Sequence, residues 1–320
     1  MWQTERTEAL VSTKIVLEPV PAPYDPVLYR GTPSPTRPVD TLDSISDAEI
    51  ALYREQGYLC VRDAFSDKLV AEVLAELEAM ALAEDPGCES VYFEGLIRNH
   101  LAIDPGRDQF GTTGRMQDFV LGQTTDQIPA LDPAVRAQFV RKFQGFVGAH
   151  PPLAALADLP ELVALVERLI GGSARLFQDM ALVKPPRGRE KPWHQDHAYF
   201  NFPLATPIVG VWIPLHPVDH TNGCMHVLPG SHRRGPQPHF MRRDWQICDT
   251  DITGQSQHFL PMNPGDLLLF DAKLAHGTPS NVTQKMRWAV QFHYVPAGAP
   301  ETAEAERLAA FGSEGKDVTC

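Results

Sequence analysis

The stretch KPWHQDH at residues 191–197 determines how the rest of the chain is interpreted, because it can hold a metal ion. In an extended strand successive side chains point to opposite faces, so His194 and Asp196 would point the same way and Gln195 the other way. One imidazole and one carboxylate then converge on a single point. They form two thirds of the 2-His-1-carboxylate triad, which leaves three positions of an octahedral Fe(II) open. The third ligand has to come from another part of the chain.

Length and charge exclude several classes of protein. The chain has 320 residues, of which 43% are hydrophobic, so it can bury a sizeable core. Its 28 Lys and Arg against 40 Asp and Glu give a net charge of -12, which argues against nucleic acid or an anionic membrane as partner, since both need a basic footprint. Five scattered cysteines indicate reduced thiols, and no apolar run reaches the length of a membrane span. We therefore expect a cytoplasmic protein whose partner is a small molecule.

The first half of the chain predicts an arm followed by helices. Residues 1–43 are rich in proline and predict an extended arm. Residues 44–173 predict a helical part: Ser46 and Glu49 form a capping box for a helix that ends near Gln56, and Ser66 caps a second helix. Two further segments look helical, residues 133–148 and 158–170.

The second half predicts strands. From residue 174 to 298 short apolar runs alternate with turn residues, as at Leu176–Val183, Ile208–Leu215 and Trp288–Val295. Many short strands at this spacing favour a sandwich or barrel over βαβ units. We expect one composite domain over residues 44–298, with the helices packed outside the β core, and a C-terminal tail over residues 299–320.

His276 is the candidate for the third ligand. It follows Gly265–Phe270, a turn and a buried strand, and it precedes Gly277, so its imidazole can lie at a strand end. Eleven positions later Arg287 begins the last apolar strand. A planar guanidinium holds a carboxylate bidentately, which suits a dicarboxylate cosubstrate.

Together these residues resemble the phytanoyl-CoA dioxygenase (PhyH) family of Fe(II)/2-oxoglutarate oxygenases. The resemblance covers roughly Ile50 to Pro296. It rests on five motifs, which are Lys184-Pro185-Pro186, His194-Gln195-Asp196, Thr221-Asn222-Gly223-Cys224, Leu228-Pro229-Gly230-Ser231-His232 and His276-Gly277-Thr278. It implies an α+β, mainly β fold whose core is a double-stranded β-helix, the cupin-like jelly roll.

The resemblance also implies roles for single residues. His194, Asp196 and His276 would ligate Fe(II), and Arg287 with the hydroxyl of Thr278 would bind the 5-carboxylate of 2-oxoglutarate. Trp212 and Met180 would form walls beside the cosubstrate. The segment that begins at Arg115 resembles a family segment whose first residue is a lysine that also reaches 2-oxoglutarate.

The implied reaction uses O2 and converts 2-oxoglutarate to succinate and CO2 while a C–H bond of a small molecule is oxidised. Related halogenases replace the metal-binding carboxylate by a small residue. Because this chain retains Asp196, hydroxylation is favoured. Four residues after the first ligand would line the substrate side, namely Gln195, His197, Tyr199 and Phe200.

Two other kinds of protein fit parts of the pattern. A cupin-like metal-binding isomerase or binding protein could use the same ligands without consuming 2-oxoglutarate, but Arg287 and Thr278 argue against it. A non-catalytic interaction protein with the same fold would not need an intact triad. Four arginines at positions 233, 234, 242 and 243 could attract an anionic substrate, although a solvated surface is the simpler interpretation.

Overall fold

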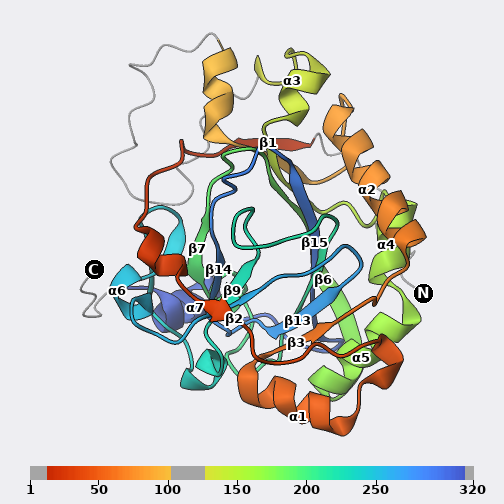
Figure 1. Cartoon of the computed structure of the whole chain (residues 1–320), viewed down its shortest axis with the longest axis vertical. Helices are drawn as coiled ribbons and strands as arrows, with labels where there is room; N and C mark the ends of the chain where they lie inside the picture. Colours follow the sequence, from red (N-terminus) through yellow and green to blue (C-terminus); the bar gives the residue numbers. More distant parts are fainter. Residues whose placement is uncertain (1–12, 102–126, 314–320) are drawn as a thin grey trace.

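Two β-sheets face each other in the computed structural model, which describes residues 13–101 and 127–313 (Figure 1). The larger sheet has eight strands in the order β1 (Lys14–Leu17), β4 (Ser90–Phe93), β5 (Val140–Gln144), β6 (Ala174–Lys184), β15 (Arg287–Pro296), β8 (Val209–Pro214), β13 (Leu267–Asp271) and β3 (Tyr58–Val61). The smaller has five in the order β2 (Thr32–Pro33), β12 (His258–Leu260), β9 (Met225–Val227), β14 (His276–Thr278) and β7 (Lys191–His194).

The jelly-roll core consists of two antiparallel sets of four strands. β6, β15, β8 and β13 pair in one sheet, and β7, β14, β9 and β12 pair in the other. Side chains from both sheets meet in one apolar cluster, in which Trp212 and Phe270 of the larger sheet pack with Val227 of the smaller. The predicted cupin-like fold is therefore confirmed. β10 (His239–Met241) and β11 (Trp245–Ile247) form a separate hairpin.

Helices cover the outer face of the larger sheet. They are α1 (Asp47–Gln56), α2 (Asp67–Leu82), α4 (Pro151–Ala157) and α5 (Pro160–Ile170). Val73 of α2 and Val166 of α5 are fully buried in the core that also holds Val290 of β15. In Figure 1 α2, α4 and α5 lie together on one side of the sheet. The helical part therefore packs outside the β core, as expected.

The predicted start of α1 is confirmed. Ser46 and Glu49 make the expected capping box, and Gly57 ends the helix with a positive φ of 86°. Such a left-handed cap favours glycine because that residue has no Cβ to clash. The serine cap of α2 is also confirmed, since the Ser66 side chain accepts a hydrogen bond from the backbone N–H of Leu69.

The predicted helix over residues 133–148 is wrong. A short helix, α3 (Pro133–Ala137), is followed by the strand β5, which pairs with both β4 and β6. A β-bulge in β5 makes Arg141 an extra residue relative to β4. Tyr92 pairs with Lys142 and Phe93 pairs with Val140, so Arg141 lies between two consecutive pairs. Val140 and Phe143 both point into the outer core for this reason. Two buried apolar residues three positions apart are also typical of one face of a helix, which explains the wrong prediction.

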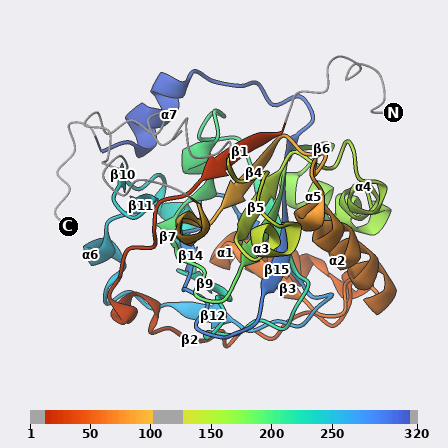
Figure 2. The same ribbon diagram turned by 90° about the horizontal axis from the view of Figure 1, so that it is seen from above.

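Both ends of the described part of the chain pack against the rest of the fold. β1 pairs with β4 and β2 pairs with β12, so the arm over residues 13–43 is extended but packed. Within the arm the 3-10 turn η1 (Pro26–Tyr29) buries Leu28 against Trp193. At the other end α7 (Glu304–Phe311) lies away from α2 and α4 and buries Phe311 (Figure 2). The division of the chain at residues 43 and 298 stays a prediction.

The remaining short helices are η2 (Leu42–Ser44), η3 (Gly95–His100), η6 (Asp196–Tyr199), η7 (Ser231–Arg234) and α6 (Asp249–Ile252). In the two described ranges no helix is both long and apolar enough to cross a membrane. Cys60, Cys88 and Cys224 are free thiols, but Cys248 is disulfide-bonded, so the expectation that every cysteine is reduced is wrong.

Candidate metal centre

His194, Asp196 and His276 meet between the two sheets. Their candidate ligand atoms all lie within 4.8 Å of one another, and all three residues are buried. Oδ1 of Asp196 lies 3.1 Å from Nε2 of His194 and 3.6 Å from Nε2 of His276. The strands bring them together, because His276 begins β14 directly opposite His194, the last residue of β7.

The expectation that His194 and Asp196 share one strand is wrong. β7 ends at His194, and Asp196 is the first residue of η6. The two side chains still converge because Gln195 between them keeps an extended backbone, with φ -113° and ψ 128°. One extended residue is enough to turn its neighbours to the same side.

Backbone carbonyls orient both imidazoles. Nδ1 of His194 donates to the carbonyl of Pro192 at 2.7 Å, and Nδ1 of His276 donates to that of Leu274 at 2.9 Å. With Nδ1 engaged in this way, Nε2 of each ring faces Asp196 and is the atom that would bind a metal. Burial, together with nearby His194, lowers the pKa of His276 to about 4, so this ring is neutral at neutral pH. Two imidazoles and a carboxylate fit Fe(II).

Sequence reasoning missed two residues that hold the carboxylate. Burial raises the pKa of Asp196, but the facing rings of His276 and His293 outweigh it and keep that pKa well below its usual range. Nε2 of His293 donates to Oδ2 of Asp196 at 2.8 Å, and Nε2 of Gln291 does so at 3.1 Å. A signal for these two residues is present in the sequence. Gln291 and His293 are polar residues at alternate positions of an otherwise apolar strand, β15.

Arg287 is a buried cation without an anion. Only 2% of its surface is exposed, and its Nη1 donates a hydrogen bond to the carbonyl of Leu182 at 3.2 Å. Its Nε has no partner, and it forms no ion pair with any residue in the described ranges. Its guanidinium carbon lies 5.8 Å from the ring centroid of Trp212. Burial, with the nearby charge of Arg141, lowers the pKa of Arg287 to about 9. A bound carboxylate would satisfy it.

Thr278 lies on the strand next to the site of Arg287, and the two predicted walls flank Gln291. Thr278 is buried on β14, and its carbonyl accepts a hydrogen bond from Lys184, which pairs with Arg287 across β6 and β15. Met180 and Trp212 are the register partners of Gln291 on its two sides. Partners in register share a face of the sheet, so both side chains point toward the metal residues.

Lys142 is another cation without an ion pair among the described residues, as is the buried Lys184. The bulge at Arg141 places it opposite Leu182, the residue whose carbonyl binds Arg287. Its ammonium lies 3.8 Å above the ring of Tyr92. Burial lowers its pKa to about 8, although Glu18 opposes this shift. Arg115, expected in a comparable role, lies outside the described residues.

The four residues expected on the substrate side separate into two pairs. Gln195 does not face the metal: its amide donates to the carbonyls of Gly235 and Lys273, and its oxygen accepts from the backbone of Gln237. His197 also points away and stacks on Phe311 of α7. We correct both assignments. The extended backbone of Gln195 turns its side chain away from those of His194 and Asp196. His197 lies in η6, which directs its ring toward α7.

Tyr199 and Phe200 lie beside the centre. The Tyr199 ring contacts that of His194 edge to face, with centroids 5.8 Å apart. Its hydroxyl donates to the carbonyl of Trp245 and accepts from Lys191. The Phe200 ring lies 4.8 Å from that of His293. Their role toward a substrate stays a prediction.

The arginines at positions 242 and 243 are neutralised. Arg243 forms two hydrogen bonds with Asp249, at 2.6 and 2.7 Å, and a third with Glu190. Arg242 also reaches Asp249, at 3.3 Å. These ion pairs favour the interpretation as surface and structural charges.

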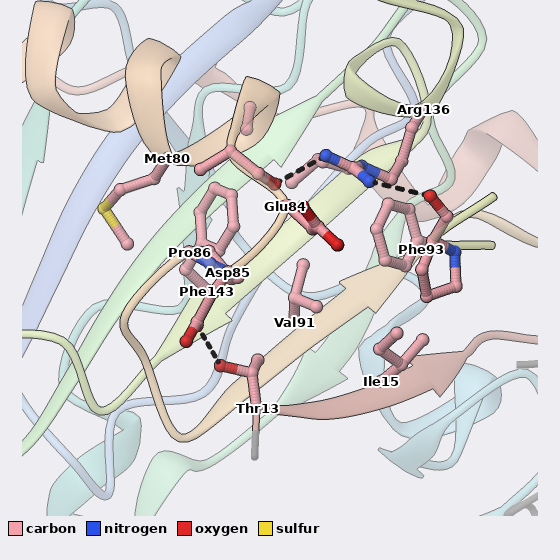
Figure 3. Close-up of a pocket in the computed structure, with 14 residues that line it drawn as sticks. Thr13, Ile15, Met80, Glu84, Asp85, Pro86, Val91, Phe93, Arg136 and Phe143 are labelled. Atoms are coloured by element: carbon pink, nitrogen blue, oxygen red, sulfur yellow. Dashed lines mark hydrogen bonds between the residues drawn. The ribbon is translucent and has the colours of Figure 1, made fainter. Parts of the chain in front are cut away.

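A cavity of about 200 Å³ lies elsewhere, on the outer face of the larger sheet (Figure 3). Its floor includes Val91, Phe93 and Phe143, and the guanidinium of Arg136 closes one side by donating to the carbonyls at the end of α2. It shares no residue with the metal centre.

The fold and site are those of a non-haem Fe(II)/2-oxoglutarate oxygenase. A family model described as "Phytanoyl-CoA dioxygenase (PhyH)" matches residues 53–289. The chain therefore belongs to the PhyH family, and it is an Fe(II)/2-oxoglutarate-dependent dioxygenase. This result rules against the alternatives of a binding or interaction protein that does not consume 2-oxoglutarate.

Relatives and solved structures agree with this class. Peroxisomal phytanoyl-CoA dioxygenase of Rattus norvegicus is 28% identical over 296 residues, which cover 88% of this chain and 77% of that protein. Ectoine dioxygenase of Bordetella bronchiseptica is 24% identical, covering 88% and 80%.

Among solved structures, the carbocyclase SnoK from nogalamycin biosynthesis has a TM-score of 0.57 at 21% identity, over 89% of this chain and 97% of that one. EctD from S. alaskensis, with 2-oxoglutarate and 5-hydroxyectoine, has a TM-score of 0.55 at 22% identity, over 94% and 89%. At these identities the two structures support the fold alone.

Proposed function

We propose that the protein hydroxylates an unactivated C–H bond of a small molecule and converts 2-oxoglutarate to succinate and CO2. The observation that carries this proposal is the carboxylate of Asp196, which lies within 3.6 Å of Nε2 of both candidate histidine ligands. In a complete 2-His-1-carboxylate set the carboxylate would fill the coordination position that a halide takes in the related halogenases. It favours hydroxylation over halogenation.

In this proposal His194, Asp196 and His276 hold Fe(II), and the metal with 2-oxoglutarate supplies the oxidising chemistry. Trp212 and Met180 limit the space beside the cosubstrate, and Tyr199 and Phe200 form the substrate side.

Arg287 binds the 5-carboxylate of 2-oxoglutarate in this proposal, with Thr278 beside it. Lys142 contributes a second positive charge from β5 and takes the part that the resemblance assigns to a lysine. Arg287 and Lys142 both lack an ion pair in the described ranges, so their positive charges can be met by an anionic cosubstrate. Charge-assisted hydrogen bonds to a guanidinium also fix the orientation of a bound carboxylate.

Anaerobic binding followed by exposure to O2 tests the proposal. Protein loaded with Fe(II) should bind 2-oxoglutarate and release succinate when O2 is admitted, and a competent substrate should accelerate this release. Asp196→Ala should abolish it. Absence of 2-oxoglutarate binding in iron-loaded protein would refute the cosubstrate assignment.

Mass spectrometry of the product identifies the reaction outcome. Hydroxylation adds one oxygen atom to the substrate, whereas ring closure removes two hydrogen atoms and epimerisation leaves the mass unchanged. This distinction matters because solved structures with the same fold include a carbocyclase and an epimerase. Candidate substrates can be screened by the succinate that they elicit. We also propose a cytoplasmic location, which the free thiols of Cys60, Cys88 and Cys224 support.

A further inference from the structure

The two oxygens of Asp196 have different neighbours. Oδ1 faces the Nε2 atoms of both candidate histidine ligands. Oδ2 points toward β15, where Nε2 of His293 lies at 2.8 Å and Nε2 of Gln291 at 3.1 Å.

Both β15 nitrogens donate to Oδ2. A carboxylate can only accept, so the protons lie on the imidazole and the amide. Nδ1 of His293 is buried without a partner, so this ring contacts the carboxylate through Nε2 alone. The nitrogens of Gln291 and His293 are 3.2 Å apart because they converge on one oxygen. Two donors use the two in-plane lone pairs of Oδ2, which leaves Oδ1 for a metal.

The donors cannot easily move away. His293 is fully buried and Gln291 is 4% exposed. Their strand β15 pairs along both edges, with β6 and β8. The rings of Phe200 and Phe177 pack against His293, with centroids at 4.8 and 6.0 Å. Packing and strand pairing therefore fix the two nitrogens relative to the core.

We propose that Gln291 and His293 are positioning residues that hold the carboxylate of Asp196 with a single oxygen, Oδ1, toward the metal. A carboxylate that bound through both oxygens would occupy a further coordination position, and the triad needs three open ones. This inference rests on the proposed metal role of Asp196.

Two measurements that need no catalytic turnover test this inference. Both are made on the variants His293→Leu and Gln291→Leu. The first is the dissociation constant of Mn(II), which we expect to rise about 10- to 100-fold, as on losing other outer-shell partners. The second is the electron paramagnetic resonance signal of nitric oxide bound to the anaerobic Fe(II)–2-oxoglutarate complex. Normalised to bound iron, this signal reports whether a coordination position is open.

Matched variants separate positioning from stability. His293→Gln can place an amide N–H near the Nε2 position, and it should restore the Mn(II) affinity and the nitric oxide signal. Tyr294→Phe removes a buried hydrogen bond to Ala157 on the other face of the same strand. It should lower the unfolding midpoint without changing either metal readout.

Each outcome has a defined meaning. A weaker Mn(II) complex or a smaller nitric oxide signal in the leucine variants supports the inference if His293→Gln reverses it. Wild-type values in both readouts, failure of the reversal, or equal losses in Tyr294→Phe would overturn it. If Asp196→Ala binds Mn(II) as tightly as the wild type, the metal assignment itself is wrong.

Discussion

At the residue scale, Arg287 should decide the affinity for 2-oxoglutarate. Hydrogen bonds to charged groups contribute about 1.5–3 kcal/mol, so Arg287→Ala should raise the KM for 2-oxoglutarate roughly 10- to 100-fold. The KM for the prime substrate should change far less. The fold should tolerate this change, because no described anion pairs with the guanidinium. Succinate release as a function of each concentration measures both constants. Equal increases in the two would contradict the assigned role.

Lys142 should make cosubstrate binding depend on pH. Burial lowers the pKa of Lys142 to about 8, so the ammonium loses its proton as the pH rises through that value. The affinity for 2-oxoglutarate should therefore fall above about pH 8. In Lys142→Arg the charge persists, so this fall should disappear. Isothermal titration with iron-loaded protein, anaerobically at pH 7 and pH 9, measures it. The same pH dependence in both proteins would exclude Lys142.

The candidate ligands could be predicted at this scale, whereas their supports could not. His194, Asp196 and His276 occur in motifs whose residue types fit a metal. Gln291 and His293 carry no motif, and their contact with Asp196 arises only when β15 packs across from η6. The assignment of Gln195 to the substrate side was wrong because it relied on closeness to His194 and Asp196 in sequence, which does not give the direction of the side chain.

At the element scale, short strands were predicted well because burial on both faces gives continuous apolar runs. The prediction for β5 was wrong for a physical reason. The bulge at Arg141 shifts the alternation, and the pairing with β4 and β6 that stabilises the strand lies far away in sequence. The same bulge turns Lys142 toward the inside of the fold, so the error concealed a candidate cosubstrate contact.

Asp179 should anchor the end of β5. Its carboxylate accepts hydrogen bonds from the backbone N–H groups of Gly145, Phe146 and Val147 at 2.6, 3.0 and 2.6 Å. Asp179→Ala leaves these donors without their acceptor, at about 1–3 kcal/mol each where they stay buried. We expect a loss of about 3 kcal/mol or more in unfolding free energy, measured by denaturant titration. Ser46→Ala, which removes an exposed helix cap, should cost about 1 kcal/mol. Similar losses in the two variants would contradict the anchoring role.

At the scale of the whole molecule, the N-terminal arm supports the metal-binding strands from outside. The indole N–H of Trp193, next to His194, donates to the carbonyl of Leu28 at 2.9 Å. The hydroxyl of Tyr29 donates to Glu190, which also binds Arg243 of the β10–β11 region. Proline content predicted an extended segment, but it could not predict these contacts, because they join residues more than 160 positions apart.

The same region should make global stability depend on pH through His226. This ring is fully buried on β9 beneath the arm, among Tyr29, Trp193 and Phe259, and neither of its nitrogens has a hydrogen-bond partner. Burial lowers the pKa of His226 to about 4, below its usual value near 6.5. Between these values the unfolded chain binds a proton that the folded protein excludes. This contribution to stability is therefore complete above about pH 6.5 and is lost as the pH falls toward 4.

His226→Phe isolates that effect. One excluded proton changes the unfolding free energy by about 1 kcal/mol per pH unit near pH 5, so the variant should lose stability less steeply on acidification by that amount. The aromatic surroundings accept phenylalanine, and no hydrogen bond is lost. Urea titrations at pH 7, 6 and 5 measure the slope. Tyr29→Phe is the control, because it alters the same cluster without removing the titrating ring. Parallel slopes for His226→Phe and the wild type would show that the folded protein admits the proton at this site.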